Sequence, residues 1–284
     1  MSKNNNNRIF MVIALLLVVV NVALGVLLWN SNKEKAIYLK QYNEVSQKFD
    51  ELEKENKTNK EEMDKLKKDY DSLLKTKTNA KKRIIYLTFD DGPSVNTPKI
   101  VNILKEKNVK ATFFVVNSDN SNGYKQILNS NNQLALHTYT HNYSKIYKSA
   151  NAFIEDIKKI HNKVKNETGI DVKNIRFAGG SSNSYMSEKE FEQIAKQLKN
   201  DGYDYFDWNC DSGDASGIQI SEKYILKQAT ACKMNNINLL MHDGGGHNNT
   251  VKALPKIIEH YQKEGYTFKL IDQNATEVKH KILK

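Results

Sequence analysis

The chain has 284 residues, two cysteines and a formal net charge of +10 at pH 7, from 43 Lys and Arg against 33 Asp and Glu. Two cysteines exclude a scaffold of several disulfides and a four-cysteine zinc site; Cys210 and Cys232 either form one bridge or remain thiols. The basic residues form no run with interleaved aromatic residues, so we expect no nucleic-acid partner. A basic domain near an anionic membrane or polymer accounts for the charge.

The first expected element is an apolar helix. Residues 9–29, IFMVIALLLVVVNVALGVLLW, carry no charge and one polar interruption, Asn21. A helix of this length spans about 30 Å, the thickness of the hydrocarbon core of a bilayer. We expect an uncleaved transmembrane anchor, because the apolar core of a cleaved signal, the alternative, is shorter, at about 7–15 residues. Residues 1–8 would then be cytoplasmic, and the protein would sit in the cell membrane as a single-pass chain with an extracellular remainder.

Residues 31–80 predict a helical spacer. The segment is rich in Lys, Glu and Asn and contains no Pro or Gly. One set of positions alternates by three and four residues, which is the a/d spacing of a coiled coil. These positions are Tyr42, Val45, Phe49, Leu52, Asn56, Asn59, Met63, Leu66, Tyr70 and Leu73. The pattern predicts a coiled coil that would make the protein a homo-oligomer, with a single solvated helix as the alternative.

From residue 82 onward, short apolar runs alternate with helical stretches. The runs are Ile84–Phe89, Ala111–Val116, Gln133–Leu136, Ile175–Phe177, Tyr203–Trp208, Ile237–Met241 and Thr267–Ile271. This alternation predicts one α/β domain with a parallel sheet, and about seven strands favour a distorted or incomplete (β/α) barrel. In such barrels the functional side chains gather at the C-terminal ends of the strands. We place this domain at residues 82–275 and a C-terminal tail at residues 276–284.

The first candidate site lies where the run Ile84–Phe89 ends. Two adjacent acids, Asp90 and Asp91, follow the run and precede Gly92 and Pro93. Side chains alternate along an extended chain, so neighbouring acids do not share a face. We interpret the pair as two acids with separate roles; turn chemistry at a strand end is the alternative.

A pair of histidines is the second candidate. His137 and His141 follow the run Gln133–Leu136 in the segment HTYTH. Two histidines with one carboxylate form a common catalytic metal site that keeps positions open for water and substrate. Asp90 or Asp91 can supply the carboxylate.

Three later segments complete the candidates: RFAGGSSN from Arg176, FDWNCDSGDASG from Phe206 and NLLMHDGGGH from Asn238. Glycines let a backbone approach a ligand closely, and an arginine can hold a carboxylate in one orientation. His242 ends the run Ile237–Met241. The other histidines are expected to be surface or helix residues, with His247 set apart because three glycines precede it.

The ordered motifs TFDDGP, HTYTH, RFAGGSSN, DSGDA and LMH resemble the polysaccharide deacetylases of the NodB-homology type, carbohydrate esterase family 4, over roughly residues 82–275. Membrane-attached members of that family act on peptidoglycan, and the order of apolar segment, spacer and domain is similar to theirs. The resemblance implies hydrolysis of the N-acetyl group of N-acetylglucosamine in peptidoglycan, which releases acetate and is expected to confer lysozyme resistance.

The resemblance also implies a role for each motif residue. Asp90 would be the general base, Asp91, His137 and His141 would hold a divalent metal, and His242 would protonate the departing amine. The expected ion is Zn²⁺, although Co²⁺, Fe²⁺, Ni²⁺ and Mn²⁺ also suit this ligand set.

Further roles are implied around these residues. Arg176 would orient Asp90, and Asp214 would hold His242 in its useful tautomer and charge state. A backbone N–H group would help to stabilise the oxyanion. The candidate donors and groove residues are Phe177, Ala178, Gly179, Gly180, Trp208 and Tyr139.

Two positions depart from the family pattern, and two other functions stay open. Ala178 stands where the family usually has Pro, and Ala215 stands where it usually has Trp, so Trp208 is a candidate replacement in the groove. The same chemistry would also serve poly-N-acetylglucosamine or N-acetylmuramic acid. A non-catalytic wall-binding module is the third interpretation, although every implied ligand and acid–base residue is present.

Overall fold

The computed structural model describes residues 3–27, 32–79, 83–119, 122–271 and 278–283. The chain divides into two compact units, Met1–Ala80 and Lys81–Lys284.

The N-terminal unit consists of helices α1 (Lys3–Leu27) and α2 (Asn32–Asn79). Within the described residues, no helix combines the length and the hydropathy needed to cross a membrane. The last two positions of the expected anchor at residues 9–29, which are positions 28 and 29, lie outside the described part. Along α2, the apolar heptad side chains from Tyr42 to Tyr70 are exposed. Their pairing in a coiled coil stays a prediction.

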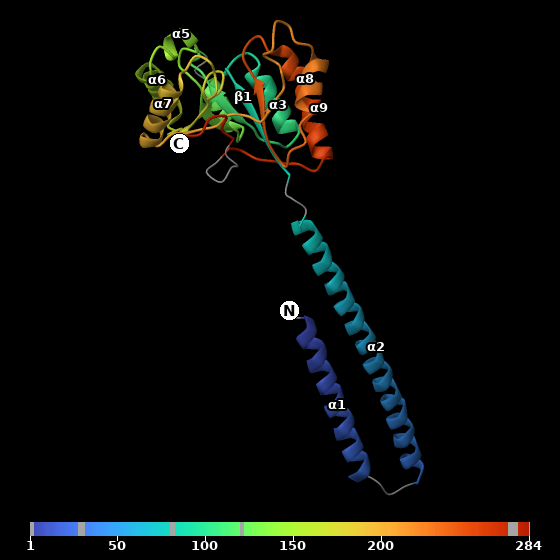
Figure 1. The fold of residues 1–284 in the computed structure, drawn as a ribbon. Coiled ribbons are helices and arrows are strands. Elements are labelled where there is room, and N and C mark those ends of the chain that lie inside the picture. Colours follow the sequence, from blue (N-terminus) through green and yellow to red (C-terminus); the bar gives the residue numbers. More distant parts are fainter. Residues whose placement is uncertain (1–2, 28–31, 80–82, 120–121, 272–277, 284) are drawn as a thin grey trace. The chain divides into compact units, whose positions relative to one another are not determined.

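The second unit alternates strands and helices (Figure 1). Its strands are β1 (Ile84–Asp90), β2 (Thr112–Val115), β3 (Gln133–Leu136), β4 (Asn174–Ile175), β5 (Asp204–Tyr205), β6 (Cys210–Asp211), β7 (Asn236–His242) and β8 (Thr267–Phe268). Its helices are α3 (Thr97–Glu106), α4 (Gly123–Asn129), α5 (Tyr143–Ile146), α6 (Ala150–Thr168), α7 (Glu188–Asn200), α8 (Glu222–Ala229) and α9 (Asn248–Lys263).

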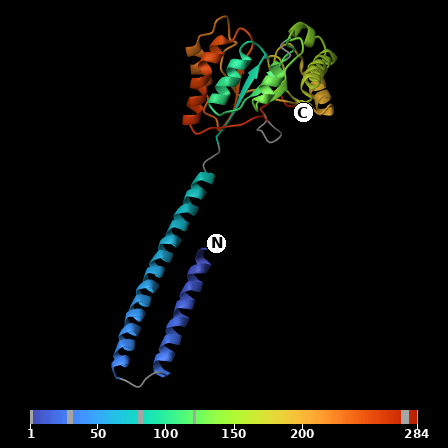
Figure 2. The ribbon, with the colours of Figure 1, turned by 180° about the vertical axis from the view of Figure 1, so that it is seen from behind.

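The strands form one sheet in the order β5-β4-β3-β2-β1-β7-β6, with β8 paired to the beginning of β1. Every pairing between described strands is parallel, and no described pairing joins β5 to β6. The α/β class and the open, barrel-like parallel sheet expected from the sequence are therefore confirmed. Helices α5–α7 cluster beside one part of the sheet and α3, α8 and α9 beside another, in both opposite views (Figures 1 and 2).

Alternation along β1 separates two packing environments. Ile85, Leu87 and Phe89 are fully buried in the large core between the sheet and its helices. Tyr86 belongs to a smaller cluster on the other face, with Phe114, Ala135, Phe206 and Ile271. Because Asp90 follows Phe89, its side chain lies on the face of Tyr86, inside the curve of the sheet.

Local signals explain where the longer helices begin and end. Helix α7 begins with a capping box, in which Ser187 and Glu190 bond each other's backbone N–H groups. Helix α6 begins after Ser149, whose side chain accepts a hydrogen bond from the N–H of Ala152, and ends at Gly169 with φ of 77°. Both helices present an apolar stripe to the large core, which also contains side chains of β3 and β4. The two helices therefore cover the part of the sheet that carries these strands.

A disulfide between Cys210 and Cys232 joins β6 to the segment after α8, and it settles the pairing that the sequence left open. The bond closes a loop with a sequence separation of 22 residues. Restricting a loop of this size in the unfolded chain stabilises a fold by about 3 kcal/mol. The bond therefore secures a two-residue strand whose own pairing is short.

Candidate active site

The predicted site residues come from the C-terminal ends of neighbouring strands. Asp90 and His242 are the last residues of β1 and β7, and they lie opposite each other in the parallel register. His137 directly follows β3, and Arg176 directly follows β4. Because the sheet order places these strand ends along one edge, residues up to about 150 positions apart in the chain converge there.

Asp90 and Asp91 have different partners. The carboxylate of Asp90 is buried, and its Oδ1 accepts a hydrogen bond from Arg176 Nη1 at 2.9 Å. Asp91 has φ of 72°, so the backbone leaves the strand geometry at that residue. Its Oδ1 lies 3.1 Å from His141 Nε2 and 3.5 Å from His137 Nε2. The left-handed turn thus directs one acid to the arginine and the next to the histidines.

Gly92 is required by close packing behind this turn. A Cβ atom at this position would lie 2.0 Å from Oδ2 of Asp243, far inside van der Waals contact. The Asp243 carboxylate is buried and accepts a hydrogen bond from Thr97 Oγ1 at the beginning of α3. The turn after β1 is therefore clamped between β7 and α3, which fixes the direction of Asp91.

The two histidines are positioned from behind. His137 Nδ1 lies 2.8 Å from the carbonyl oxygen of Arg176, so this nitrogen carries the proton and Nε2 is left with a lone pair. Burial lowers the pKa of His137 to about 3, so its ring is neutral at physiological pH. Between the histidines, the Asp156 carboxylate accepts hydrogen bonds from the N–H groups of Tyr139 and Thr140. This anchors the loop that carries both rings.

Asp91, His137 and His141 fit a divalent metal. Their ligand atoms lie within 4.8 Å of one another. Asp91 Oδ1 is buried and accepts no hydrogen bond from the described residues, which is unusual for a buried carboxylate oxygen. One carboxylate and two imidazoles form a common set for a catalytic divalent ion. The orphaned oxygen beside the Nε2 atoms of His137 and His141 meets that requirement.

Arg176 is fully buried inside the curve of the sheet. Besides Asp90, its guanidinium donates to Thr88 Oγ1 and to Asn238 Oδ1. It also donates to the carbonyl oxygens of Phe206 and Asp207. The guanidinium lies 4.0 Å from the centre of the Phe114 ring, so an aromatic face covers it. These contacts satisfy the arginine and hold the Asp90 carboxylate in one orientation.

His242 and Asp214 form a buried acid–base pair. His242 Nδ1 lies 2.7 Å from Asp214 Oδ1, while Asp214 Oδ2 accepts from the N–H of His242 and from Thr250 Oγ1. Burial alone would lower the pKa of His242, but the hydrogen bond and charge of Asp214, with the charges of Asp90 and Asp91, raise it to about 9. His242 is therefore cationic at neutral pH and can donate a proton.

The predicted oxyanion residues lie in the loop after β4, where several of their groups already contact protein. The Phe177 and Ala178 side chains are buried in the large core, so they can offer a ligand only backbone groups. The N–H of Gly180 already donates to the carbonyl of Phe177. The Tyr147 hydroxyl donates to the carbonyl of Ala178 at 2.7 Å, which holds this loop although proline is absent.

Trp208 and Tyr139 both pack against protein. The Trp208 indole lies edge-on to the His280 ring, with centroids 4.8 Å apart, and a Cβ at Gly180 would come within 3.0 Å of it. Tyr139 packs against the large core. These contacts assign both rings to packing within the domain.

Asp243, described above, and two further supporting acids were not among the predicted site residues. Asp156 lies on α6 at helical spacing from Phe153 and Ile160, so a carboxylate on a buried apolar face was its sequence signal. Asp207 accepts hydrogen bonds from the N–H groups of Ser181 and His280. It thereby ties the loop after β4 to the C-terminal tail, and nothing local in the sequence indicates that partner.

Replacing Arg176 by Met should destabilise the fold by about 3–5 kcal/mol at pH 7, because Asp90 would be left as an unpaired buried charge. Urea unfolding of residues 81–284, followed by circular dichroism, measures the loss. The double variant Arg176→Met/Asp90→Asn removes that charge and should regain part of the stability. Equal losses in the single and double variants would contradict the charge pairing.

Comparison with known proteins agrees with this geometry. A family model described as polysaccharide deacetylase matches residues 77–203. A peptidoglycan-N-acetylglucosamine deacetylase of Bacillus cereus is 30% identical over 204 residues, covering 67% of this chain and 87% of that protein.

Solved structures show the same fold. The catalytic domain of a peptidoglycan N-acetylglucosamine deacetylase from Eubacterium rectale matches with a TM-score of 0.66 and 34% identity, covering 72% of this chain and 94% of that domain. A polysaccharide deacetylase from Bacillus cereus matches with a TM-score of 0.61 and 26% identity, covering 69% of this chain and 95% of the other. The chain therefore belongs to the polysaccharide deacetylase family, the NodB-homology proteins of carbohydrate esterase family 4.

Proposed function

We propose that residues 81–284 form a metal-dependent deacetylase that hydrolyses the N-acetyl group of N-acetylglucosamine in peptidoglycan. The observation that carries the proposal is the convergence of three units at one sheet edge. These units are the Asp90–Arg176 pair, the Asp91–His137–His141 ligand set and the His242–Asp214 pair. The proteins named as peptidoglycan N-acetylglucosamine deacetylases among its relatives support the choice of substrate.

Asp91, His137 and His141 would hold the divalent metal, for which we propose Zn²⁺. When bound, such an ion supplies Lewis-acid chemistry, since it polarises a carbonyl group and makes a water more acidic. His137 contributes a neutral imidazole whose free nitrogen faces the site, because the carbonyl of Arg176 fixes its tautomer.

Asp90 acts as the general base of the proposed reaction. Burial raises the pKa of its carboxyl group, and the charge of Arg176 opposes that rise. A raised pKa makes the carboxylate a better acceptor for the proton of the attacking water. Because Arg176 occupies Oδ1, the other oxygen, Oδ2, is left to take that proton.

His242 completes the hydrolysis as the general acid. Addition of the water oxygen to the acetamide carbon must be followed by cleavage of the carbon–nitrogen bond, and the leaving amine requires a proton. Because Asp214 holds Nδ1 of His242, the other ring nitrogen, Nε2, is left to donate that proton to the amine. The products are acetate and a glucosamine unit with a free amine.

Acetate release from purified peptidoglycan tests the proposed reaction. A soluble fragment of residues 81–284 should release acetate, lose activity with a chelator and regain it when Zn²⁺ is restored. Asp90→Asn should lower the rate by about 10²–10⁴-fold, the range contributed by one general base. If acetate were released only from poly-N-acetylglucosamine oligomers, or only from N-acetylmuramic acid, that substrate would replace the N-acetylglucosamine of peptidoglycan in the proposal. No acetate from any N-acetylated glycan would favour a wall-binding module.

The pH–rate profile of kcat/KM should be bell-shaped. Activity requires Asp90 without its proton, so the acid limb should lie above the usual range of aspartate, since burial raises its pKa. Activity also requires His242 with its proton, so the rate should fall as pH rises through about 9. Asp214→Asn removes the charge that holds this proton and should shift the alkaline limb to lower pH. An alkaline limb that stays in place would contradict the assignment of His242 as the acid.

We further propose that the catalytic unit works outside the cytoplasmic membrane. The Cys210–Cys232 disulfide supports an oxidising compartment, and the uncharged residues 9–29 provide a candidate attachment segment. Protease added to intact protoplasts should therefore digest residues 81–284 and spare a cytoplasmic marker protein. Protection until the protoplasts are lysed would reject an extracellular location.

A further inference from the structure

A third imidazole lies beside the His242–Asp214 pair. His247 is the N-cap residue of α9 and follows three consecutive glycines. Its ring stacks on the His242 ring, with centroids 5.1 Å apart and an interplanar angle of 23°. His247 Nδ1 lies 3.9 Å from Asp214 Oδ2, and one ligand atom from each of the three residues lies within 4.8 Å of the others.

We propose that Asp214, His242 and His247 form a second divalent-cation site, suited to Zn²⁺, whose occupation inhibits the enzyme. This site is distinct from Asp91, His137 and His141, since the two sets share no residue. One carboxylate with two imidazoles is a zinc-binding set that leaves room for water as a further ligand.

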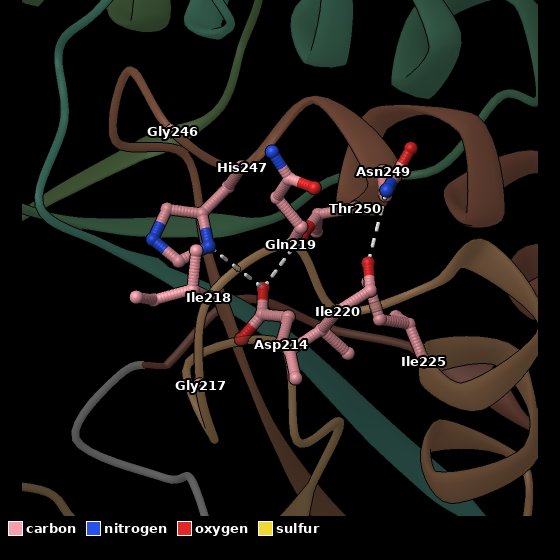
Figure 3. Close-up of a pocket in the computed structure, with 10 residues that line it drawn as sticks. All are labelled: Asp214, Gly217, Ile218, Gln219, Ile220, Ile225, Gly246, His247, Asn249 and Thr250. Atoms are coloured by element: carbon pink, nitrogen blue, oxygen red, sulfur yellow. Dashed lines mark hydrogen bonds and ion pairs between the residues drawn. The ribbon is translucent and has the colours of Figure 1, made fainter.

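The surroundings of His247 leave room for an ion. Asp214 and His247 line a cavity of about 360 Å³, together with Ile218, Gln219, Asn249 and Thr250. Figure 3 shows His247 facing the Asp214 carboxylate across this cavity, with Thr250 on the same carboxylate oxygen. An ion bound to the Asp214 carboxylate would therefore lie beside this cavity, where water molecules could complete its coordination.

The segment before His247 can adjust to coordination. Two atoms bound to one zinc ion at about 2.0–2.1 Å lie roughly 3.3 Å apart in tetrahedral geometry. The 3.9 Å between His247 Nδ1 and Asp214 Oδ2 is longer than this, so the ring has to approach. Gly245 and Gly246 have no atom within 4 Å of their Cβ positions, so no side chain packs against that side of the loop. The Asn96 amide donates hydrogen bonds to the carbonyls of Gly244 and Gly245, which leaves Gly246 as the position where the backbone can adjust.

A cation bound at this second site would remove the proton donor of the proposed reaction. This consequence rests on the proposed function, whereas the existence of the site does not. In the proposed reaction, His242 donates from Nε2 as an imidazolium whose Nδ1 proton is held by Asp214. A cation bound at Nδ1 displaces that proton to solvent and binds the Asp214 carboxylate in its place. The remaining Nε2–H then belongs to a neutral, metal-bound imidazole, which is a weaker acid than imidazolium. The amine would no longer be protonated, and its carbon–nitrogen bond would not break.

Zinc stoichiometry tests the site independently of activity. The full-length, untagged protein is stripped with a chelator, dialysed against increasing Zn²⁺ and assayed for bound zinc. Wild type should bind two zinc ions, and His247→Gln should weaken the second by at least about tenfold, as expected for loss of a ligand. His260→Gln, a matched change on the same helix, should bind as wild type does. A single zinc ion in wild type, or an unchanged second ion in His247→Gln, overturns the proposal.

Inhibition tests the consequence. Acetate release is measured for each protein relative to its own rate at one equivalent of Zn²⁺. Excess Zn²⁺ should inhibit wild type and His260→Gln at the same concentration, whereas His247→Gln should require about tenfold more. Equal inhibition of all three proteins overturns the inhibitory role. If no protein releases acetate from any glycan, the proposed function fails, while the zinc stoichiometry still decides whether the second site exists.

Discussion

The catalytic unit is arranged around one buried positive charge, the guanidinium of Arg176. Moving a charge of this kind out of water costs several kcal/mol unless a counter-charge and hydrogen-bond acceptors replace the lost hydration. Asp90 supplies the counter-charge, and the neutral acceptors come from β1, from β7 and from the segment after β5. Because each acceptor must remain in place, the strand ends that carry the site are fixed relative to one another.

This constraint explains how two adjacent acids acquire different chemistry. Asp90 continues the strand alternation and enters the interior, where Arg176 keeps one of its oxygens occupied. Asp91 leaves that alternation through a left-handed backbone turn, which is supported by the tight packing of Gly92 against Asp243. A strand that simply continued would have sent the second carboxylate towards the helix layer. The turn instead brings it to two imidazoles.

Local patterns in the sequence predicted the parts of this fold that depend on local physics. The run Ile84–Phe89 became β1, and Gln133–Leu136 became β3, because burial on one or both faces leaves a readable apolar pattern. The sheet order was not predictable in the same way, since the pairing of β1 with β7 joins segments about 150 residues apart. The two-residue strand β6 is too short to leave any periodic signal.

The candidate site divides along the same line. The motifs named the side chains that meet at the sheet edge, but they did not indicate the complete burial of Arg176. Asp156 could have been recognised from its position on the apolar face of α6, whereas Asp207 could not, because its partner His280 is distant in the chain. His247 lies close to His242 because of the path of a glycine-rich loop. The spacing of residues in the sequence does not predict that path.

The docking of the C-terminal tail has a consequence for the order of folding. Lys281 donates its N–H to Ser181, and His280 contacts both Asp207 and the carbonyl of Trp208. The loop after β4 is thus held by residues about 100 positions further along the chain. Bringing together segments so far apart costs conformational entropy, which the docking contacts must offset. The geometry around the Arg176 loop therefore depends on a long-range docking step, and the loop and residues 280 and 281 become ordered together.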